Sequence, residues 1–216
     1  MNLSFLINGG VILKIGIMGG TFDPIHFGHL IMAEYARETL DLDKVIFVPT
    51  GIHPLKVNKA ISPSHIRVEM ISLAIESNSC FEVSTIEIDK EGISYTIDTL
   101  RLLKGKYKSS ELYFILGTDI LFEIEKWKDF RQLSRICKLV LFHRAGDTDS
   151  IVEDKIRQLK MQYGLKFEKI ESPKIEISST EIRNRVFNNK SIKYMLPQNV
   201  EEYIAGNNLY KGDTNV

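Results

Sequence analysis

Short apolar segments alternate with segments of helical periodicity along most of this chain. Apolar runs rich in β-branched or aromatic residues predict strands buried on both faces at residues 15–18, 44–49, 112–117 and 138–142. Residues 81–88 alternate apolar and polar positions, which predicts a half-exposed strand at a sheet edge, and a last strand is predicted at 165–170.

The segments between these strands repeat apolar residues with the period of a helix. Helices are predicted to begin near residues 30, 64, 94, 149, 179 and 197, with Ser94 as an N-cap. On the second helix, Arg67 and Glu69 are expected to face solvent. The helix over residues 149–163 is expected to bury one side, made of Ile151, Ile156 and Leu159.

Regular alternation of strands and helices predicts an α/β protein with one Rossmann-like, doubly wound parallel sheet. A chain of 216 residues suits one domain of ordinary size. We therefore expect a single domain over residues 14–210, preceded by an N-terminal extension at 1–13 and followed by a C-terminal tail at 211–216.

Composition and charge narrow the class of partner. Lys plus Arg and Asp plus Glu both number 28, so the formal net charge is zero and no global field attracts nucleic acid. No apolar run reaches transmembrane length, and residues 1–11 lack the features of a signal peptide. The two cysteines suggest buried thiols rather than a disulfide or zinc site. We expect a cytoplasmic enzyme acting on small molecules, and its oligomeric state, including a homo-oligomer, stays open.

The most informative stretch is Gly19–His29, which joins the first strand to the first helix. Its glycines let the backbone turn tightly and bring N–H groups close to an anion. A helix N-terminus adds orphan donors and partial positive charge. His26 and His29 are three residues apart, so both imidazoles can face one point. The stretch predicts an anion site with two titratable donors.

A second helix N-terminus is predicted far downstream. It offers the hydroxyls of Ser178, Ser179 and Thr180, followed on the first turn by Arg183. A simple N-cap needs only one hydroxyl, so the set favours a second anion contact.

Several other side chains follow predicted strands, where α/β proteins bind ligands. Lys56 and Arg144 are candidates for phosphate contacts, and Asp119 for a ribose contact. A solvated loop lysine and a helix-capping aspartate are equally good interpretations of Lys56 and Asp119. Trp127 could stack on an aromatic ring or cover the edge of the core.

Two stretches resemble the signatures of the nucleotidylyltransferase superfamily. The first signature, Gly20–His29, resembles G-T-F-D-P-x-H-x-G-H, and the second signature, Ile177–Arg183, resembles I-S-S-T-x-I-R. Segments 94–100, 117–127 and 196–210 resemble bacterial nicotinate-nucleotide adenylyltransferases in particular. The resemblance covers nearly all of residues 14–210. It implies that nicotinate mononucleotide and ATP are joined to give deamido-NAD and pyrophosphate.

The resemblance also implies roles for individual residues. It gives His26, His29 and Arg183 catalytic roles and expects Mg²⁺ to be bound mainly through ATP, with no metal site of the protein's own. One departure is that the family's P-P-H-K reads His53-Pro54-Leu55-Lys56 here, with leucine in place of a histidine. The ATP contacts it implies are Gly19, Gly20, Thr21, Phe22, Asp23, His26, His29, Asp119, Ser178, Ser179, Thr180 and Arg183. The nicotinate nucleotide contacts it implies are Lys56, Tyr95, Thr96, Trp127 and Arg144.

Two other functions fit the superfamily. Phosphopantetheine adenylyltransferases share both signatures but usually are shorter and lack the features at 94–96 and Trp127. A non-catalytic nucleotide-sensing module would be expected to have lost the histidines, which are present here. The choice between nicotinate and nicotinamide mononucleotide depends on backbone donors that the sequence does not reveal.

Overall fold

Six parallel strands form the central sheet in the computed structural model of this protein, which describes all residues except 1–5, 8–9, 53–60, 145–149, 173–174 and 212–216. Their order is β5-β4-β3-β6-β7-β8. The chain thus builds the sheet outward from β3 to one edge and then from β6 to the other, which is the order of a Rossmann-like doubly wound sheet. The predicted fold class is confirmed. The strands are β3 (Leu13–Gly20), β4 (Lys44–Pro49), β5 (Phe81–Val83), β6 (Ser110–Gly117), β7 (Lys138–Arg144) and β8 (Phe167–Ser172).

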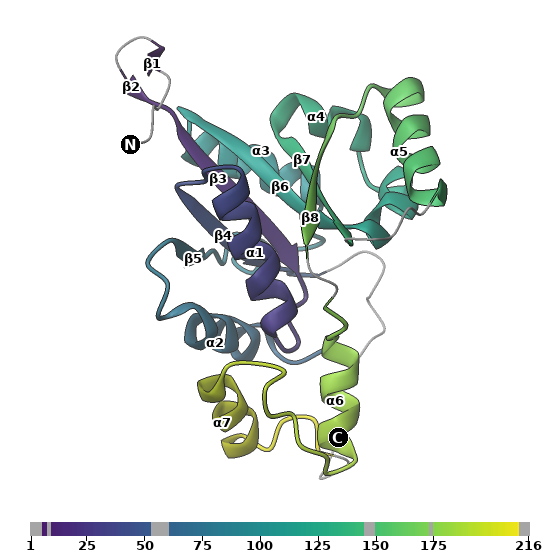
Figure 1. The fold of residues 1–216 in the computed structure, drawn as a ribbon. Helices are drawn as coiled ribbons and strands as arrows, with labels where there is room; N and C mark the ends of the chain where they lie inside the picture. The colour runs from purple at the N-terminus through teal and green to yellow at the C-terminus, as the bar shows by residue number, and fades with distance from the viewer. Residues whose placement is uncertain (1–5, 8–9, 53–60, 145–149, 173–174, 212–216) are drawn as a thin grey trace.

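Helices connect the strands and extend beyond the sheet (Figure 1). They are α1 (Phe27–Thr39), α2 (Ser64–Ile75), α3 (Thr96–Lys106), α4 (Leu133–Ile136), α5 (Ser150–Tyr163), α6 (Ser179–Phe187) and α7 (Gln198–Gly206). Three short 3₁₀ helices follow β6, at η1 (Thr118–Phe122), η2 (Ile124–Lys126) and η3 (Phe130–Gln132). A two-stranded antiparallel pair, β1 (Leu6–Ile7) and β2 (Gly10–Val11), precedes β3.

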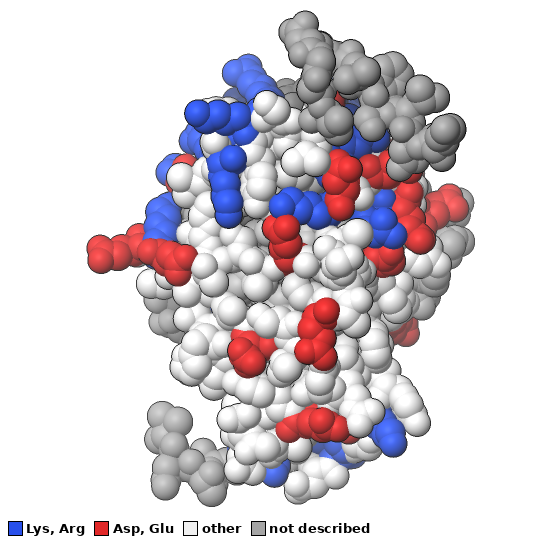
Figure 2. Space-filling view, turned by 90° about the vertical axis from the view of Figure 1, so that its left-hand side faces the viewer, with Lys and Arg blue, Asp and Glu red and all other residues white. Residues whose placement is uncertain are grey.

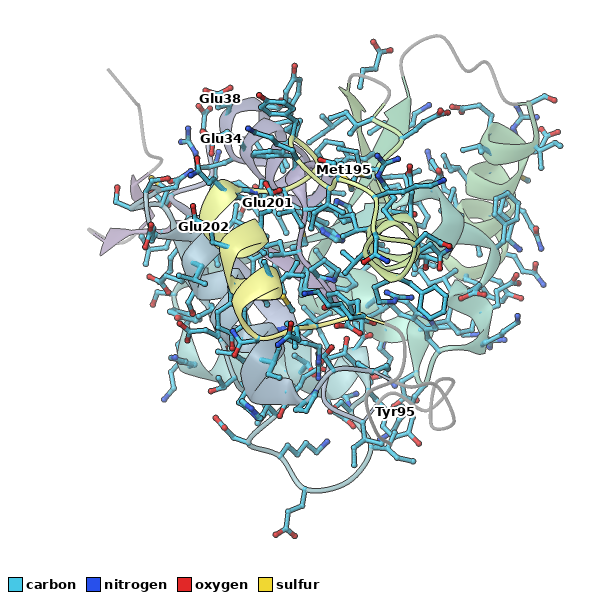
Figure 3. The ribbon with its side chains drawn as sticks, turned by 90° about the horizontal axis from the view of Figure 1, so that it is seen from below. Glu34, Glu38, Tyr95, Met195, Glu201 and Glu202 are labelled. Carbon is cyan, nitrogen blue, oxygen red and sulfur yellow. The ribbon has the colours of Figure 1, made fainter. Side chains whose placement is uncertain are left out.

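Each face of the sheet carries its own hydrophobic core. One core joins the sheet to α1, α2 and α7 through residues such as Ala33, Met70 and Val200. The other joins it to α3, α4 and α5 through residues such as Leu100 and Leu159. Figure 3 shows the two sides, with Glu34 and Glu38 of α1 on one and Tyr95, just before α3, on the other.

The predicted elements are found with several local differences. The strand predicted at 81–88 ends at Val83, although it does lie at the sheet edge. Tyr95 is the N-cap of α3, because the Ser94 hydroxyl donates to Glu87 O instead. In α5 the buried residues are Val152 and Leu159, whereas Ile151 is exposed.

Arg67 contradicts the prediction that it faces solvent. Only 4% of its surface is exposed, whereas Glu69 is exposed as expected. The reason is helical geometry, since Arg67 precedes Met70 and Ile71 by three and four residues and shares their buried face.

Acidic and basic side chains are mixed on the surface, as expected for a chain with no net charge. On the face shown in Figure 2, basic and acidic side chains lie next to one another. Among the helices that the structure describes, none has both the length and the apolar composition needed to cross a bilayer.

Candidate functional site

The first signature begins where β3 ends, next to the centre of the sheet. The order of the strands reverses between β3 and β6, and α/β proteins bind ligands at such a switch point. Phe22 is buried in a left-handed conformation, with φ of 51°, and its ring folds back over Gly20. A Cβ on Gly20 would lie 3.0 Å from that ring, so a larger residue here would require the Phe22 ring to shift by a few tenths of an ångström. Gly19 is exposed, and Gly20 and Thr21 are partly exposed beside it.

Asp23 is buried and holds the loop from inside. Its Oδ1 accepts a hydrogen bond of 2.6 Å from the Tyr210 hydroxyl, and its Oδ2 accepts one of 3.2 Å from Ser62 N. Both carboxylate oxygens are thus engaged with the protein, so the structure gives Asp23 an anchoring position rather than an open ATP contact.

His26 and His29 lie against each other at the start of α1. Their ring centroids are 3.8 Å apart, and His26 N donates to His29 Nδ1 over 3.3 Å. Since Nδ1 accepts, a neutral His29 carries its proton on Nε2. His26 Nδ1 is buried without a hydrogen-bond partner among the described residues. A Cβ on Gly28 would come within 2.9 Å of that atom, so glycine is required between the two histidines.

The environment of the two histidines favours their neutral forms. Burial lowers the pKa of His26 from 6.5 to about 4. Burial, followed by the charge of His26, lowers the pKa of His29 well below its ordinary value. In the ligand-free protein both imidazoles are hydrogen-bond donors without charge at neutral pH. A bound polyanion would raise both pKa values and favour proton uptake.

The second signature docks directly onto the first. Ser178 caps α6 by accepting a hydrogen bond from Glu181 N over 3.1 Å. The Ser179 hydroxyl donates to Pro24 O over 2.8 Å, and Arg183 Nη1 donates to Asp23 O over 2.7 Å. Two segments about 155 residues apart in sequence are therefore in direct contact. The second amino group of Arg183 donates to the Thr180 hydroxyl over 3.2 Å.

A cavity of about 270 Å³ opens at the carboxyl ends of β3, β4 and β6. Gly19, Gly20 and Thr21 form one part of its lining, which we call the phosphate end. Phe114 also lines the cavity, whereas His26, His29 and the second signature do not. Another part of the lining is formed by residues of the 94–96 segment and of the segment after η2. We call this the ring end, and it is lined by Tyr95, Thr96, Lys126, Trp127 and Lys128.

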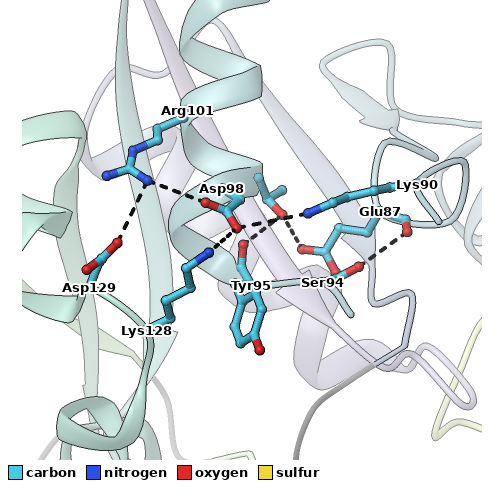
Figure 4. A network of polar contacts seen from close by, with 9 residues as sticks. Glu87, Lys90, Ser94, Tyr95, Asp98, Arg101, Lys128 and Asp129 are labelled. Carbon is cyan, nitrogen blue, oxygen red and sulfur yellow. Dashed lines mark hydrogen bonds and ion pairs between the residues drawn. The ribbon is translucent and has the colours of Figure 1, made fainter. Parts of the chain in front are cut away.

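The ring end is supported by polar contacts near the surface (Figure 4). Lys128 lies over the ring of Tyr95, 4.7 Å from its centroid, and pairs with Asp98 at 2.9 Å. Asp98 also meets Arg101 at 3.4 Å. Trp127 is half-buried, with its ring 6.2 Å from that of Phe114, so part of the indole remains available to the cavity.

Three of the predicted contacts cannot be placed. Lys56 and Leu55 lie outside the described residues. Asp119 belongs to η1 directly after β6, and Arg144 ends β7, but their side chains are outside the described part of the chain. Both backbone positions are at carboxyl ends of strands, where the sequence predicts them.

Three residues near the site were missed by sequence reasoning. Arg67 donates to Thr21 O, and Tyr210 donates to Asp23. Glu87 lines the cavity, and burial raises its pKa above the ordinary value. The helical spacing of Arg67 with Met70 could have revealed its burial, whereas no local pattern marks Tyr210 or Glu87.

Comparison with known proteins defines the class to which this fold and site belong. The family described as cytidylyltransferase-like matches residues 17–185. The chain belongs to the cytidylyltransferase-like family.

Two relatives that are similar over nearly their whole length carry the same name. A Thermoanaerobacter sp. protein named probable nicotinate-nucleotide adenylyltransferase is 46% identical over 202 residues, which cover 93% of this chain and 96% of the relative. One of the same name from Moorella thermoacetica is 47% identical, with 92% of each chain covered. The resemblance predicted from sequence is confirmed.

Solved structures support the fold at lower identity. Plasmodium falciparum nicotinic acid mononucleotide adenylyltransferase complexed with NaAD superposes with a TM-score of 0.74 and 23% identity, covering 92% of this chain and 97% of the other. The same enzyme complexed with APC gives a TM-score of 0.71 at 22% identity, over the same shares of the two chains. At these identities the likeness concerns the fold.

Proposed function

We propose that this protein is an adenylyltransferase that joins nicotinate mononucleotide to the adenylyl group of ATP, giving deamido-NAD and pyrophosphate for NAD biosynthesis. One observation carries the proposal. A single cavity at the switch point of the sheet is lined both by Gly19, Gly20 and Thr21 of the first signature and its approach and by Trp127. The names of the relatives and of the NaAD-bound neighbour support the same substrates.

The proposed reaction is a direct displacement. A phosphate oxygen of nicotinate mononucleotide attacks the α-phosphorus of ATP. A new P–O bond forms as the bond from the α-phosphorus to the bridging oxygen breaks, and pyrophosphate leaves with its electron pair. The attacking phosphate is already an anion at neutral pH, so no general base is required. The protein aligns the two nucleotides and stabilises charge on the leaving group.

The first signature supplies the donors for the triphosphate. Backbone N–H groups from Gly19 to Phe22 and the imidazoles of His26 and His29 would bind its oxygens. Neutral imidazoles serve this role because each keeps one N–H donor. As the polyanion raises their pKa values, protonation would add positive charge where pyrophosphate develops.

The second signature would bind the same triphosphate from the opposite side. Ser178, Ser179 and Thr180 bring the N-terminus of α6, and Arg183 brings a fixed positive charge. In the ligand-free protein Arg183 donates to Asp23 O and to the Thr180 hydroxyl. ATP would therefore compete with these two internal contacts for the guanidinium group.

The remaining residues would bind the nucleoside parts. Asp119 would accept hydrogen bonds from the ribose of ATP. At the ring end, Trp127 would stack on the pyridine ring while Thr96 and nearby backbone donors receive its carboxylate. The phosphate of this substrate would be met by Lys56 and Arg144.

Mg²⁺ is proposed to enter the site coordinated to ATP oxygens, where it would neutralise part of the phosphate charge. Across the described ranges, no group of three or more His, Cys, Asp or Glu side chains could hold a metal ion. We propose that the reaction takes place in the cytoplasm, where ATP would be available and where free cysteines such as Cys80 and Cys137 stay reduced.

A pyrophosphate-release assay tests the proposal. ATP is held constant, and nicotinate mononucleotide, nicotinamide mononucleotide and phosphopantetheine are compared as acceptors. We expect the highest kcat/KM with the first, because buried donors aimed at a carboxylate reject its amide. Fastest turnover with phosphopantetheine, or none with any acceptor, would overturn it.

Because Trp127 is the only tryptophan, its fluorescence should also change as nicotinate mononucleotide binds.

A further inference from the structure

The peptide group between Thr50 and Gly51 forms hydrogen bonds at both of its polar atoms, one with buried Arg67 and one with half-buried Glu87. Arg67 Nη2 donates to Thr50 O over 2.9 Å. At the opposite edge of the same peptide group, Gly51 N donates to Glu87 Oε2 over 3.3 Å. A cation therefore holds the carbonyl and a carboxyl group holds the N–H of one peptide unit. We call Arg67, this peptide group and Glu87 the peptide clamp.

Arg67 connects that peptide to two other backbone segments. Nη1 donates to Thr21 O over 2.9 Å, and Nε donates to Ser62 O over 3.0 Å. All three acceptors are main-chain carbonyls, so the guanidinium fork fixes the relative positions of three segments. Burial lowers the pKa of Arg67, and the nearby charge of Asp23 opposes that shift. Lysine could not reach three separated acceptors from one nitrogen atom.

Glu87 extends the clamp toward the ring end. Its Oε1 accepts from the Thr99 hydroxyl over 2.7 Å, and Glu87 O accepts from the Ser94 hydroxyl over 3.3 Å, as Figure 4 shows around Glu87. The fit is tight, because a Cβ on Gly51 would lie 2.3 Å from Glu87 O. Only glycine at this position allows the peptide to approach Glu87 so closely.

The clamp connects several segments that line the cavity. Thr21 follows β3 at the phosphate end, Thr50 follows β4, and Glu87 precedes the segment that supplies the ring end. All three line the cavity. The clamp thus sets the distance between the loop that would hold the triphosphate and the segments that would hold the pyridine nucleotide.

We infer that Arg67 and Glu87 are positioning residues for adenylyl transfer, which act through the Thr50–Gly51 peptide group to hold the two substrate loops at reacting distance. Neither residue needs to touch the reacting atoms. In-line displacement depends steeply on alignment, and a misplacement of about 1 Å can reduce the rate by roughly 10²-fold. The clamp should therefore affect kcat more than it affects the binding of either substrate.

The inference rests on the proposed function, and steady-state kinetics of R67K and E87A test it. Lysine keeps the charge of Arg67 but loses the fork, and E87A removes both acceptors. We expect kcat to fall at least tenfold in each variant, with KM for ATP and for nicotinate mononucleotide changed less than threefold. The double variant R67K/E87A should lose much less than the product of the two single losses, because both residues act on one peptide group.

A matched pair distant from the cavity provides the control. Arg37 and Glu34 on α1 also form an arginine–glutamate pair, with Arg37 Nε 3.0 Å from Glu34 Oε1. R37K and E34A should keep wild-type kcat. Thermal denaturation of every variant identifies an assay temperature at which all of them are folded. At that temperature, a substitution that only destabilises the fold would leave kcat unchanged, although it lowers Tm.

The outcomes are distinct. A kcat within threefold of wild type in folded R67K would overturn the inference. If R67K does not fold, E87A decides the question. A kcat of E87A within threefold of wild type would overturn the inference, and a tenfold lower kcat would support it. Multiplicative losses in the double variant would also overturn it. The wild-type protein is assayed first. If it releases no pyrophosphate, the proposed function is refuted, and the variants are then not informative about the clamp.

Discussion

The two ends of the cavity are held in different ways. At the phosphate end, buried groups fix the backbone, since Arg67, Asp23 and His26 are each less than 7% exposed. At the ring end, ion pairs near the surface hold the side chains, since those of Asp98 and Lys128 are 25% and 45% exposed. The same protein thus combines a buried, hydrogen-bonded frame with a solvated one.

This difference indicates which end tolerates adjustment. Buried hydrogen bonds are costly to break because the abandoned group stays away from water, whereas exposed ion pairs exchange readily with solvent. The buried contacts at the phosphate end should therefore hold its backbone in one arrangement. The exposed ion pairs at the ring end should constrain their neighbours less, which would suit the proposed binding of a pyridine ring there.

The largest effect is expected when a proposed phosphate donor is removed from the first signature, which follows the phosphate end along the chain. In His29→Ala, kcat for pyrophosphate release should fall by about 10²–10³-fold, because a prearranged donor to the leaving group is lost. His65 lies exposed on α2, and His65→Ala should retain wild-type kcat. Circular dichroism and Tm establish that both variants fold. Wild-type turnover in folded His29→Ala would show that the phosphate end does not depend on its imidazoles.

An intermediate effect is expected from pH on the ligand-free protein. The pKa of His26 is about 4 in the folded state and 6.5 when unfolded, so the unfolded chain binds more protons between these values. Stability should therefore fall as the pH drops from 6.5 toward 4, with His26 accounting for about 2 kcal/mol at pH 5.

Urea denaturation from pH 7.5 to pH 5 measures this slope, and His26→Gln supplies the comparison. The variant should lose part of the pH dependence, whereas His65→Ala should keep all of it. Equal slopes in wild type and His26→Gln would mean that His26 is solvated, which would remove the contrast between the two ends.

The smallest effect is expected at the ring end. Asp98→Asn removes ion pairs to Lys128 and Arg101, yet these groups are partly exposed, and such pairs contribute less than about 1 kcal/mol. Urea denaturation at low and high salt should show a small loss that shrinks as salt screens the charges. A loss above about 2 kcal/mol at high salt would place the ring end in the same class as the phosphate end.

The sequence predicts most of the fold because its pattern is regular. Buried parallel strands read as apolar runs, and β4 and β7 begin at the residues predicted. The strand predicted at 81–88 is too long, because beyond Val83 the chain leaves β4 and turns toward Glu87. Alternation of apolar and polar residues indicates only that a segment is exposed on one side. A loop that packs against the core shows the same alternation as an edge strand.

The site is predicted less completely, because the signatures mark only those residues whose type and spacing are unusual. Gly20, His26 and Arg183 stand out by type and spacing. Arg67 and Glu87 act on main-chain atoms of their neighbours, and a charged residue on a helix or loop normally indicates a solvated surface. Only the folded structure brings their partners within reach.

The contact between Tyr210 and Asp23 joins positions 187 residues apart in sequence. It has a consequence for synthesis on the ribosome, where the first signature emerges long before its partner. The sheet can begin to assemble around the early strands. The buried carboxylate of Asp23, however, receives its phenolic donor only after residue 210 has left the exit tunnel. A nascent chain therefore carries an incompletely anchored loop until Tyr210 has emerged and can reach Asp23.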